Sequence, residues 1–256
     1  MRLPGNLAFR VGRRLPPRVK QLVNAARGID TPVLVDRPAA RSVAVLAPHP
    51  DDELLGCGGT IQKHLAAGEP VTVVFLTSGE RTASFAGQEL DARLRQREAE
   101  AVAACAGIGV PESSLRFLHI SDGGVDGTHV APVRDAVGDA DLVYAPNPID
   151  AHRDHRATAQ LLAAALDELP AVRRVALFEV WTPLYPNTLV DISAQIERKI
   201  DALSRYTSAL EVVDYTHTTR GLAAYRAGHG LHGRGYAEAF TVLDRDPFLE
   251  LMRRLG

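Results

Sequence analysis

The sequence predicts an α/β fold built on a mainly parallel sheet that helices cover on both faces. Short apolar runs rich in β-branched residues alternate with longer helical patterns along most of the chain. Several of these runs end abruptly at proline or at polar residues. With 256 residues, of which 46% are hydrophobic and 23% charged, the chain has the size and balance of one large globular domain.

The first half of the chain contains three predicted strands, at residues 43–47, 71–77 and 115–120. Helices are expected at 53–67, 90–107 and 130–137, and a mobile loop of small and polar residues at 81–90. Gly56, Gly58 and Gly59 weaken the first helix but permit close packing on the sheet. They do not match GxGxxG, so nucleotide binding is not expected. His64 on the same helix is expected to face solvent.

The second half predicts strands at 141–145, 174–181, 188–192 and 238–243, with helices at 156–168 and 194–206. The segment at about 207–236 is less regular. Glycines at 228, 230, 233 and 235 favour a loop that is able to cover a site, so we expect a variable lid here. The histidines of this segment, His217, His229 and His232, are interpreted as surface or lid residues rather than ligands.

Charge and composition exclude several classes of partner. A net charge of -2 gives no reason to expect nucleic acid or acidic lipid as a general partner. No apolar run approaches the ~20 residues of a membrane span. Cys57 and Cys105 lie in helical patterns and predict buried thiols rather than a disulfide, which suits a cytoplasmic protein. A homo-oligomer of unspecified state is also expected.

Residues 1–40 form a basic N-terminal arm in this interpretation, ahead of a domain at 41–256. Arginines alternate with apolar residues there, without the apolar core region of a signal peptide. Residues 17–27 fit a short basic amphipathic helix, for which peripheral contact with a membrane or a partner is one interpretation. An arm that packs on the domain, or a frayed terminus, is the favoured alternative.

Two groups of polar residues each follow a predicted strand and lead into a helix. The first group is His49, Asp51, Asp52 and Glu53, and the second is Asp150, His152, Asp154 and His155. Open α/β sheets bind their ligands at the carboxyl ends of strands. Because charged side chains are costly to bury unless they are paired or bound, the two groups predict one shared site if their strands are neighbours.

The pattern within these groups indicates a metal site. His49 and Asp52 are spaced i, i+3, so both can point the same way at a helix start. With His155 they supply two imidazoles and one carboxylate, a set that suits zinc and leaves a coordination position for water. Non-haem Fe²⁺ favours a similar set and is the alternative ion.

Neighbouring residues suggest the chemistry that such a site performs. Zinc lowers the pKa of bound water towards ~7, and Asp51 can accept the proton of that water. A protonated His152 would offset the negative charge that develops on a carbonyl oxygen. Asp154 is able to hydrogen-bond His152 and favour its charged form. The proton for an amine leaving group comes from Asp51 or from His152, and the sequence leaves both open.

PHPDDE at 48–53, together with PNPIDAHRDH at 146–155, resembles the PIG-L/LmbE-like family of zinc-dependent N-acetylglucosaminyl de-N-acetylases. The likeness runs through most of 42–243. It implies a Rossmann-like three-layer fold and removal of the N-acetyl group from an N-acetylated amino sugar or glycoconjugate. The resemblance implies these roles: zinc ligands His49, Asp52 and His155, general base Asp51, oxyanion stabiliser His152, and Asp154 tuning His152.

The resemblance also implies substrate contacts. Glu80 falls in the loop that matches the one after the family's second strand, and Asp122 in a sugar-contacting loop. Arg97 and Glu100 match the family's R-x-x-E motif, in which the arginine helps to hold substrate. Trp181 follows a strand and can stack on a sugar ring, although packing at the core or rim is favoured. Position 150 is Asp, and the tyrosine seen nearby in mycothiol-pathway relatives is absent, which argues against that branch.

Two other classes of function compete with this one. The first is a catalytically silent metal- and sugar-binding module, against which the intact Asp51 and His152 argue, since binding alone needs neither. The second is a membrane-associated partner protein that uses the basic arm.

Overall fold

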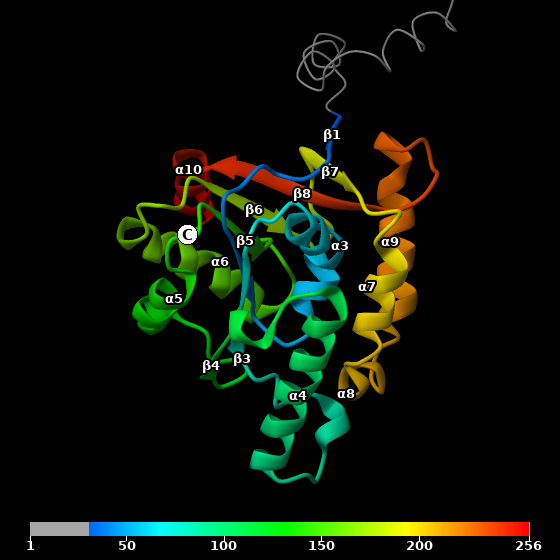
Figure 1. The fold of residues 1–256 in the computed structure, drawn as a ribbon. Coiled ribbons are helices and arrows are strands. Elements are labelled where there is room, and N and C mark those ends of the chain that lie inside the picture. Colours follow the sequence, from blue (N-terminus) through cyan, green and yellow to red (C-terminus); the bar gives the residue numbers. More distant parts are fainter. Residues whose placement is uncertain (1–30, 256) are drawn as a thin grey trace, which may run out of the picture.

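A computed structural model describes residues 31–255, and its centre is one eight-stranded sheet in the order β1-β7-β8-β6-β5-β2-β3-β4 (Figure 1). The strands are β1 Val33–Val35, β2 Val43–Ala47, β3 Val71–Thr77, β4 Leu115–Ile120, β5 Leu142–Pro146, β6 Arg174–Phe178, β7 Thr188–Asp191 and β8 Ala237–Asp244. All neighbouring pairs are parallel except those that β8 makes with β6 and β7. The predicted mainly parallel sheet is confirmed.

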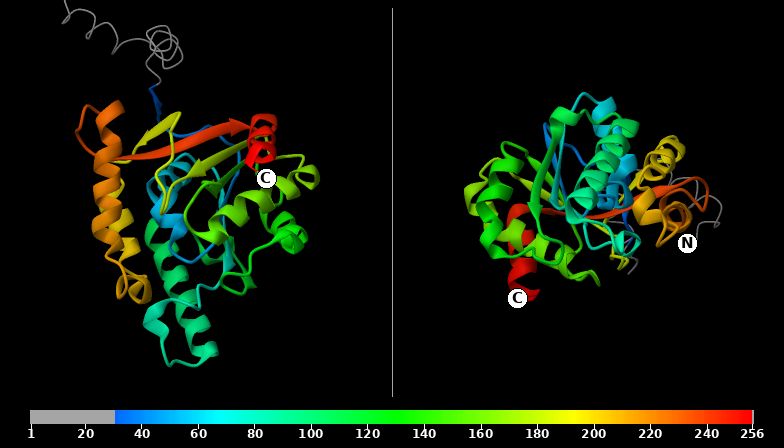
Figure 2. Two further views of the ribbon diagram at one scale, coloured as in Figure 1. Left: turned by 180° about the vertical axis from the view of Figure 1, so that it is seen from behind. Right: turned by 90° about the horizontal axis from the view of Figure 1, so that it is seen from below.

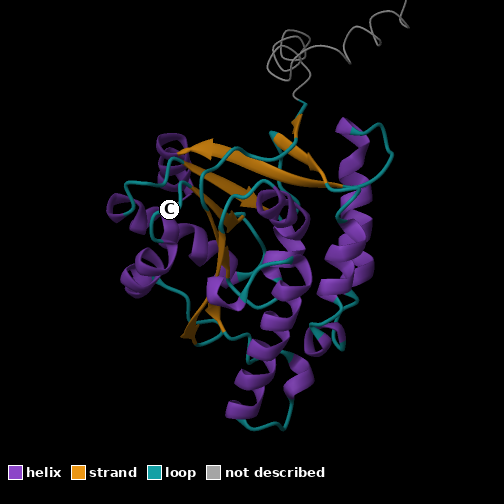
Figure 3. Cartoon of the chain, viewed as in Figure 1, coloured by secondary structure: helices purple, strands orange, loops and turns teal. Residues whose placement is uncertain are grey.

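Helices cover both faces of this sheet (Figures 2 and 3). One face packs against α3 Asp52–Ala66, α4 Leu90–Ile108, α7 Ile196–Leu203 and α9 Tyr215–Gly230, and the short α8 Thr207–Leu210 lies beside them. The other face packs against α5 Val130–Val137, α6 Arg153–Ala165 and α10 Arg245–Leu255. The two large apolar cores lie one on each face, and a small third cluster of Leu184, Leu189 and Ala239 lies apart from them, so the predicted Rossmann-like three-layer fold is confirmed.

The centre of the sheet positions the two polar groups side by side. From β2 the chain crosses to β3 and β4 on one side, and it then returns to β5 on the other side of β2. Val43–Val45 of β2 pair with Leu142–Tyr144 of β5 in parallel register. The sequence order therefore reverses between β2 and β5, and ligands bind open sheets at such a point.

Two glycines let α3 approach the sheet closely. A Cβ at Gly56 would lie 2.2 Å from a ring carbon of Phe178, and a Cβ at Gly59 would lie 2.6 Å from Ile192 Cγ2. A side chain at Gly56 would have to displace the Phe178 side chain on β6, and one at Gly59 the side chain of Ile192, which directly follows β7. Close packing through these residues is thus confirmed. Cys57 and Cys105 are buried free thiols, as predicted.

The segment at 207–236 differs from its predicted irregular form. Asp214 accepts a hydrogen bond from the His217 backbone and caps the long helix α9. Gly228 and Gly230 lie inside that helix, and Gly230 packs near Leu34 and Leu189 at the β1–β7 edge of the sheet. Gly228 and Gly230 are therefore helical rather than part of a loop, because helix capping and packing on the sheet override their low helix propensity, whereas Gly233 and Gly235 lie in the predicted loop.

The ends of the chain also differ from expectation. Val33–Val35, which the sequence assigned to the basic arm, pair with β7 as an edge strand, because the apolar run VLV can extend the sheet. The predicted amphipathic helix at 17–27 lies outside the described residues. The helix α10, which closes the chain, was not predicted. Within residues 31–255, no helix is both long enough and apolar enough to cross a membrane.

His64 is buried rather than exposed. Its Nδ1 lies 2.5 Å from Glu69 Oε2, and its Nε2 lies 2.8 Å from the hydroxyl of Tyr144 on β5. Arg37 donates to both carboxylate oxygens of Glu69. We call these four residues the His64 cluster. The prediction failed because the polar partners that stabilise a buried histidine here come from three other segments of the chain.

Candidate active site

The turn between β2 and α3 carries the first polar group. Asp51 immediately precedes α3 and has a φ of 119°, in a region that aspartate rarely adopts. Glu53 Oε2 accepts the Asp51 backbone N–H at 3.1 Å. Pro48 O accepts hydrogen bonds from the backbone and hydroxyl of Thr77 on β3. These contacts fix the turn above the carboxyl end of the sheet.

The second polar group opens α6, which begins earlier than predicted. His152 caps this helix, and its Nδ1 accepts the Asp154 backbone N–H at 3.2 Å. The Asp150 carboxylate accepts the backbone N–H groups of His152, Trp181 and Thr182. Asp150 therefore joins the loop after β5 to the loop after β6.

Three side chains from these two groups meet between β2 and β5. Asp52 Oδ2 lies 3.2 Å from His49 Nδ1 and 3.2 Å from His155 Nε2. The two imidazole ring centroids are 5.4 Å apart. The residues that the sequence predicts as metal ligands thus lie together, with their donor atoms facing one another.

His155 is the residue whose surroundings fit a metal ion most clearly. It is fully buried, yet neither ring nitrogen has a hydrogen-bond partner among the described residues. Its Nδ1 lies 3.2 Å from Asp150 Oδ1, as is common for histidines whose other nitrogen binds a metal. Two imidazoles and a carboxylate match the ligand chemistry of zinc. His49 also lies within ligand distance of two further groups, His152 with His155, and Asp122 with Asp154.

Asp154 contacts a different histidine from the one predicted. Its Oδ2 lies 3.3 Å from His49 Nε2 and accepts the Gly123 backbone N–H at 2.7 Å. Its only hydrogen bond to His152 is the one that its backbone N–H donates to Nδ1. The predicted hydrogen bond between the Asp154 carboxylate and His152 is replaced by the contact with His49, but the negative charge of Asp154 still raises the pKa of His152, in the predicted direction. Asp154 instead orients the imidazole of His49.

The charges of the site shift several pKa values. Burial lowers the pKa of His155, but the Asp52 charge and the contacts with Asp150 and Asp52 outweigh burial and raise it to about 9. Burial raises the pKa of Asp51 to about 7, although the Arg97 charge opposes the rise. Such a carboxylate is suited to exchange protons near neutral pH.

His152 is expected to be neutral rather than protonated. Burial lowers its pKa, and the positive charges of His49 and His155 lower it further. Because its Nδ1 accepts a hydrogen bond, the single proton of the neutral ring lies on Nε2. The lowered pKa disfavours the predicted charged form of His152, and the neutral ring retains a donor that can serve an oxyanion.

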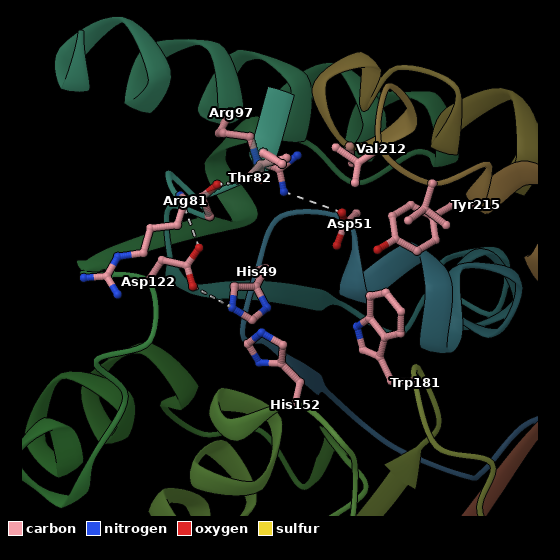
Figure 4. Close-up of a pocket in the computed structure, with 14 residues that line it drawn as sticks. His49, Asp51, Arg81, Thr82, Arg97, Asp122, His152, Trp181, Val212 and Tyr215 are labelled. Atoms are coloured by element: carbon pink, nitrogen blue, oxygen red, sulfur yellow. Dashed lines mark hydrogen bonds and ion pairs between the residues drawn. The ribbon is translucent and has the colours of Figure 1, made fainter. Parts of the chain in front are cut away.

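A cavity of about 240 Å³ opens above these residues (Figure 4). His49, Asp51 and His152 line it near the proposed metal site, and Arg81 and Asp122 line one side. The opposite side is apolar and is formed by Trp181, Ala209, Val212, Val213 and Tyr215. Trp181 is 51% exposed and packs edge-on against Tyr215. Trp181 thus forms the cavity rim, where a sugar ring can reach it.

Arg97 lies in the cavity wall and is 1% exposed. One guanidinium nitrogen lies 3.5 Å from Asp51 Oδ2 and also donates to the Pro50 carbonyl. The other donates to Ser208 Oγ, which in turn donates to Glu100. These contacts hold the turn that carries Asp51. Direct contact of Arg97 with substrate stays a prediction.

Glu80 does not line the cavity, although its neighbours Gly79 and Arg81 do. Its Oε1 accepts the Ser121 hydroxyl and the Asp122 backbone N–H at 2.9 Å. Glu80 thus holds the loop that presents Asp122, and direct contact of Glu80 with substrate stays a prediction.

Sequence reasoning missed part of the cavity lining, namely Arg81, Thr82, Val212, Val213 and Tyr215. Arg81 and Thr82 fall in the predicted loop at 81–90, which shows no motif. Val212, Val213 and Tyr215 fall in the segment predicted as a lid. The only available signal was the apolar character of residues 209–215, just before the Asp214 cap of α9.

Comparison with known proteins finds sequences similar to the part of the chain that carries this site. The sequence model of the PIG-L family, described as GlcNAc-PI de-N-acetylase, matches residues 44–166. A probable N-acetyl-alpha-D-glucosaminyl L-malate deacetylase 2 from Bacillus cereus is 28% identical over 197 residues, which cover 69% of this chain and 88% of the relative.

Solved structures show the same fold. The N,N'-diacetylchitobiose deacetylase of Pyrococcus horikoshii is 22% identical, with a TM-score of 0.71 over 98% of this chain and 99% of its own. The hydratase GalB of Pseudomonas putida is also 22% identical, with a TM-score of 0.67 over 79% of this chain and 96% of its own. The fold alone therefore does not fix the reaction. Residues 44–166, which the PIG-L family model matches, contain β2, β5 and both polar groups, so the similarity of this chain to that family lies in the part that carries the candidate site.

Proposed function

We propose that this protein is a metal-dependent hydrolase that removes the N-acetyl group from an N-acetylated amino sugar or glycoconjugate. One observation carries the proposal: Asp52 Oδ2 lies 3.2 Å from both His49 Nδ1 and His155 Nε2, beside the Asp51 carboxylate at the cavity. The Bacillus cereus relative, named as a deacetylase of an N-acetylglucosaminyl compound, supports the substrate class.

His49, Asp52 and His155 would hold the metal ion, with zinc preferred and Fe²⁺ as the alternative. When bound, such an ion polarises a carbonyl oxygen and makes a water molecule more acidic. Asp154 keeps His49 in place through the contact with Nε2, and Asp150 does the same for His155 through Nδ1. These outer carboxylates fix the nitrogen that each imidazole presents to the ion.

Asp51 and His152 divide the remaining chemistry between them. Asp51 takes a proton from the attacking water as the new C–O bond forms at the acetyl carbon. His152 Nε2–H donates to the carbonyl oxygen, where negative charge develops. A preorganised donor of this kind contributes roughly 3–4 kcal/mol to transition-state stabilisation.

The leaving amine needs a proton when the C–N bond breaks. A neutral His152 with its one proton on Nε2 would become an imidazolate if it gave that proton away. Asp51, which has just accepted a proton, is therefore the better donor. The products are acetate and a free amino sugar, and Asp51 returns to its carboxylate form.

The cavity suits one sugar ring rather than a large ligand. Its volume of about 240 Å³ lies below the ~300–1,000 Å³ of pockets for drug-sized ligands. Trp181 and Tyr215 offer an apolar surface for one face of a ring, and Asp122 offers a carboxylate for its hydroxyl groups. The rest of a glycoconjugate would extend past Trp181 into solvent.

An assay of released acetate tests the proposal. The purified protein, loaded with Zn²⁺ or Fe²⁺, is incubated with N-acetylglucosamine and with derivatives that carry different groups at the anomeric carbon. We expect acetate and a free amine in equal amounts. The matched control is Asp51→Asn, which should keep its metal and lose activity. Metal and sugar binding without acetate release would instead support the silent binding module.

A further inference from the structure

We propose that Glu53 and Tyr206 act as positioning residues for Asp51, through a buried clamp that holds its backbone in the left-handed conformation. The inference rests on the proposed function, since Asp51 is the general base of that reaction. Glu53 lies two positions after Asp51, whereas Tyr206 lies 153 positions after Glu53, between α7 and α8.

The clamp consists of two hydrogen bonds on one carboxylate. The Asp51 backbone N–H donates to Glu53 Oε2 at 3.1 Å, and the Tyr206 hydroxyl donates to Glu53 Oε1 at 2.5 Å. Glu53 and Tyr206 are both fully buried. Each carboxylate oxygen thus has a donor, and neither side chain reaches the cavity. Glu53 cannot contact substrate, so any effect on the reaction must pass through Asp51.

Asp51 needs such a restraint because its conformation is unfavourable. A φ of 119° is rare for a residue with a side chain and persists only where surrounding contacts enforce it. The same conformation separates Asp51 from Asp52: Asp52 faces the two histidines, whereas Asp51 lines the cavity. If the turn relaxed, the Asp51 carboxylate would leave the position from which it reaches the attacking water.

The turn at residues 206–208 also acts on Asp51 through a second series of contacts, which passes through Arg97. Ser208, two residues after Tyr206, accepts from Arg97 at 3.1 Å, and Arg97 lies 3.5 Å from Asp51 Oδ2. Residues 206–208 therefore act on the Asp51 backbone through Glu53 and on its carboxylate through Arg97. This turn leads directly into residues 209–215, of which Ala209, Val212, Val213 and Tyr215 line the cavity.

Packing alone does not explain a carboxylate at position 53. A leucine would fill an apolar site without the cost of burying a polar carboxyl group. Despite this cost, position 53 holds a residue that hydrogen-bonds both the Asp51 N–H and the Tyr206 hydroxyl, which a leucine cannot do. A glutamine would make both hydrogen bonds too, because its amide oxygen can accept from Asp51 while its NH₂ donates to the Tyr206 oxygen.

The test measures kcat, KM and bound metal for Glu53→Leu, Glu53→Gln and Tyr206→Phe in the full-length, metal-loaded protein. The matched control is Tyr144→Phe, which deletes the hydroxyl of an equally buried tyrosine in the His64 cluster. We expect kcat to fall about 100-fold in Glu53→Leu and about tenfold in Tyr206→Phe, with KM and metal content unchanged. Glu53→Gln should recover most of the kcat, and Tyr144→Phe should keep the wild-type value.

Wild-type kcat in a folded, metal-loaded Glu53→Leu protein would overturn the clamp, as would an equal loss of kcat in Tyr144→Phe. A wild-type protein that releases no acetate would instead refute the proposed function. In that case a crystal structure of Glu53→Leu still decides the clamp. A φ of Asp51 that moves to negative values supports it, and an unchanged φ overturns it.

Discussion

His64 and His155 are both fully buried, each beside a carboxylate, yet their hydrogen bonding is opposite. Both nitrogens of His64 have partners, in Glu69 and Tyr144. Neither nitrogen of His155 has a hydrogen bond within residues 31–255, although Asp52 and Asp150 oxygens lie 3.2 Å away. A buried polar group that lacks partners calls for an explanation. The contrast favours a structural role for His64 and supports the proposed role of His155 as a metal ligand.

The electrostatics follow the same division. Burial lowers the pKa of His64 more strongly than Glu69 raises it, and Arg37 neutralises that carboxylate. At His155 the negative charges prevail over burial. A divalent cation would compensate the excess negative charge at His155, whereas the His64 cluster needs none.

The largest expected effect separates the two histidines by metal content. His155→Ala should lose the metal and all measurable activity, because one of its three ligands is gone. His64→Ala should keep a full equivalent of metal and the kcat of the wild type. Elemental analysis of dialysed protein measures this. Full occupancy in His155→Ala would remove it from the ligand set.

Removal of the metal should change the activity and stability that depend on the proposed site at His155, and it should leave the His64 cluster unchanged. Chelation should abolish acetate release, and Zn²⁺ should restore it. At a free zinc concentration of 100 times Kd, binding stabilises the fold by about 2.7 kcal/mol, which raises Tm by roughly 5–10 °C. The same rise is expected in His64→Ala and none in His155→Ala. Thermal unfolding with and without zinc provides the comparison, and equal shifts in both variants would contradict it.

His64 should matter for stability where His155 does not. His64→Ala leaves the Tyr144 hydroxyl unpaired and opens a cavity, so we expect a loss of about 2–4 kcal/mol in the free energy of unfolding. At a pH above about 9, where His155 has lost the charge that attracts Asp52 and Asp150, His155→Ala should cost less in the metal-free protein, because its nitrogens have no hydrogen bonds to lose. Denaturant titration of both metal-free variants measures the difference, and a greater loss in His155→Ala would reverse the assignment.

The smallest effect is expected at the cavity rim. Trp181→Ala should raise KM about 5- to 20-fold, as expected from the loss of one stacking contact, and leave kcat nearly unchanged. The control is Tyr225→Ala, an exposed aromatic residue on α9 that does not line the cavity. Steady-state kinetics on one glycoconjugate measures KM and kcat for both variants. An unchanged KM in Trp181→Ala would place the sugar elsewhere.

The two polar groups at the centre of the sheet could be predicted because each is signalled by residues that are adjacent in the sequence. Each polar group follows a strand, so the meeting of His49, Asp52 and His155 required only that β2 and β5 be neighbours. Contacts between distant segments were not predictable in this way. Asp154 is two residues from His152 in sequence, yet its carboxylate contacts His49, 105 residues away.

The tail shows a second limit of local signals. Glycines indicated a loop at 228–230, but the Asp214 cap and contacts with Leu34 and Leu189 keep this region helical. Likewise, His64 lies on a helix with no motif around it. Its partner Glu69 is five residues away in sequence, but its partner Tyr144 lies on a distant strand. Long-range packing, which one sequence does not record, decided both cases.

Anomalous X-ray diffraction from zinc-loaded crystals tests the central claim most directly. We expect one peak, bonded at about 2.0–2.2 Å to His49 Nδ1, an Asp52 oxygen and His155 Nε2, with Asp51 unbound beside it. A peak held instead by His49 Nε2 with Asp122 and Asp154, or no zinc on His155, would contradict the account.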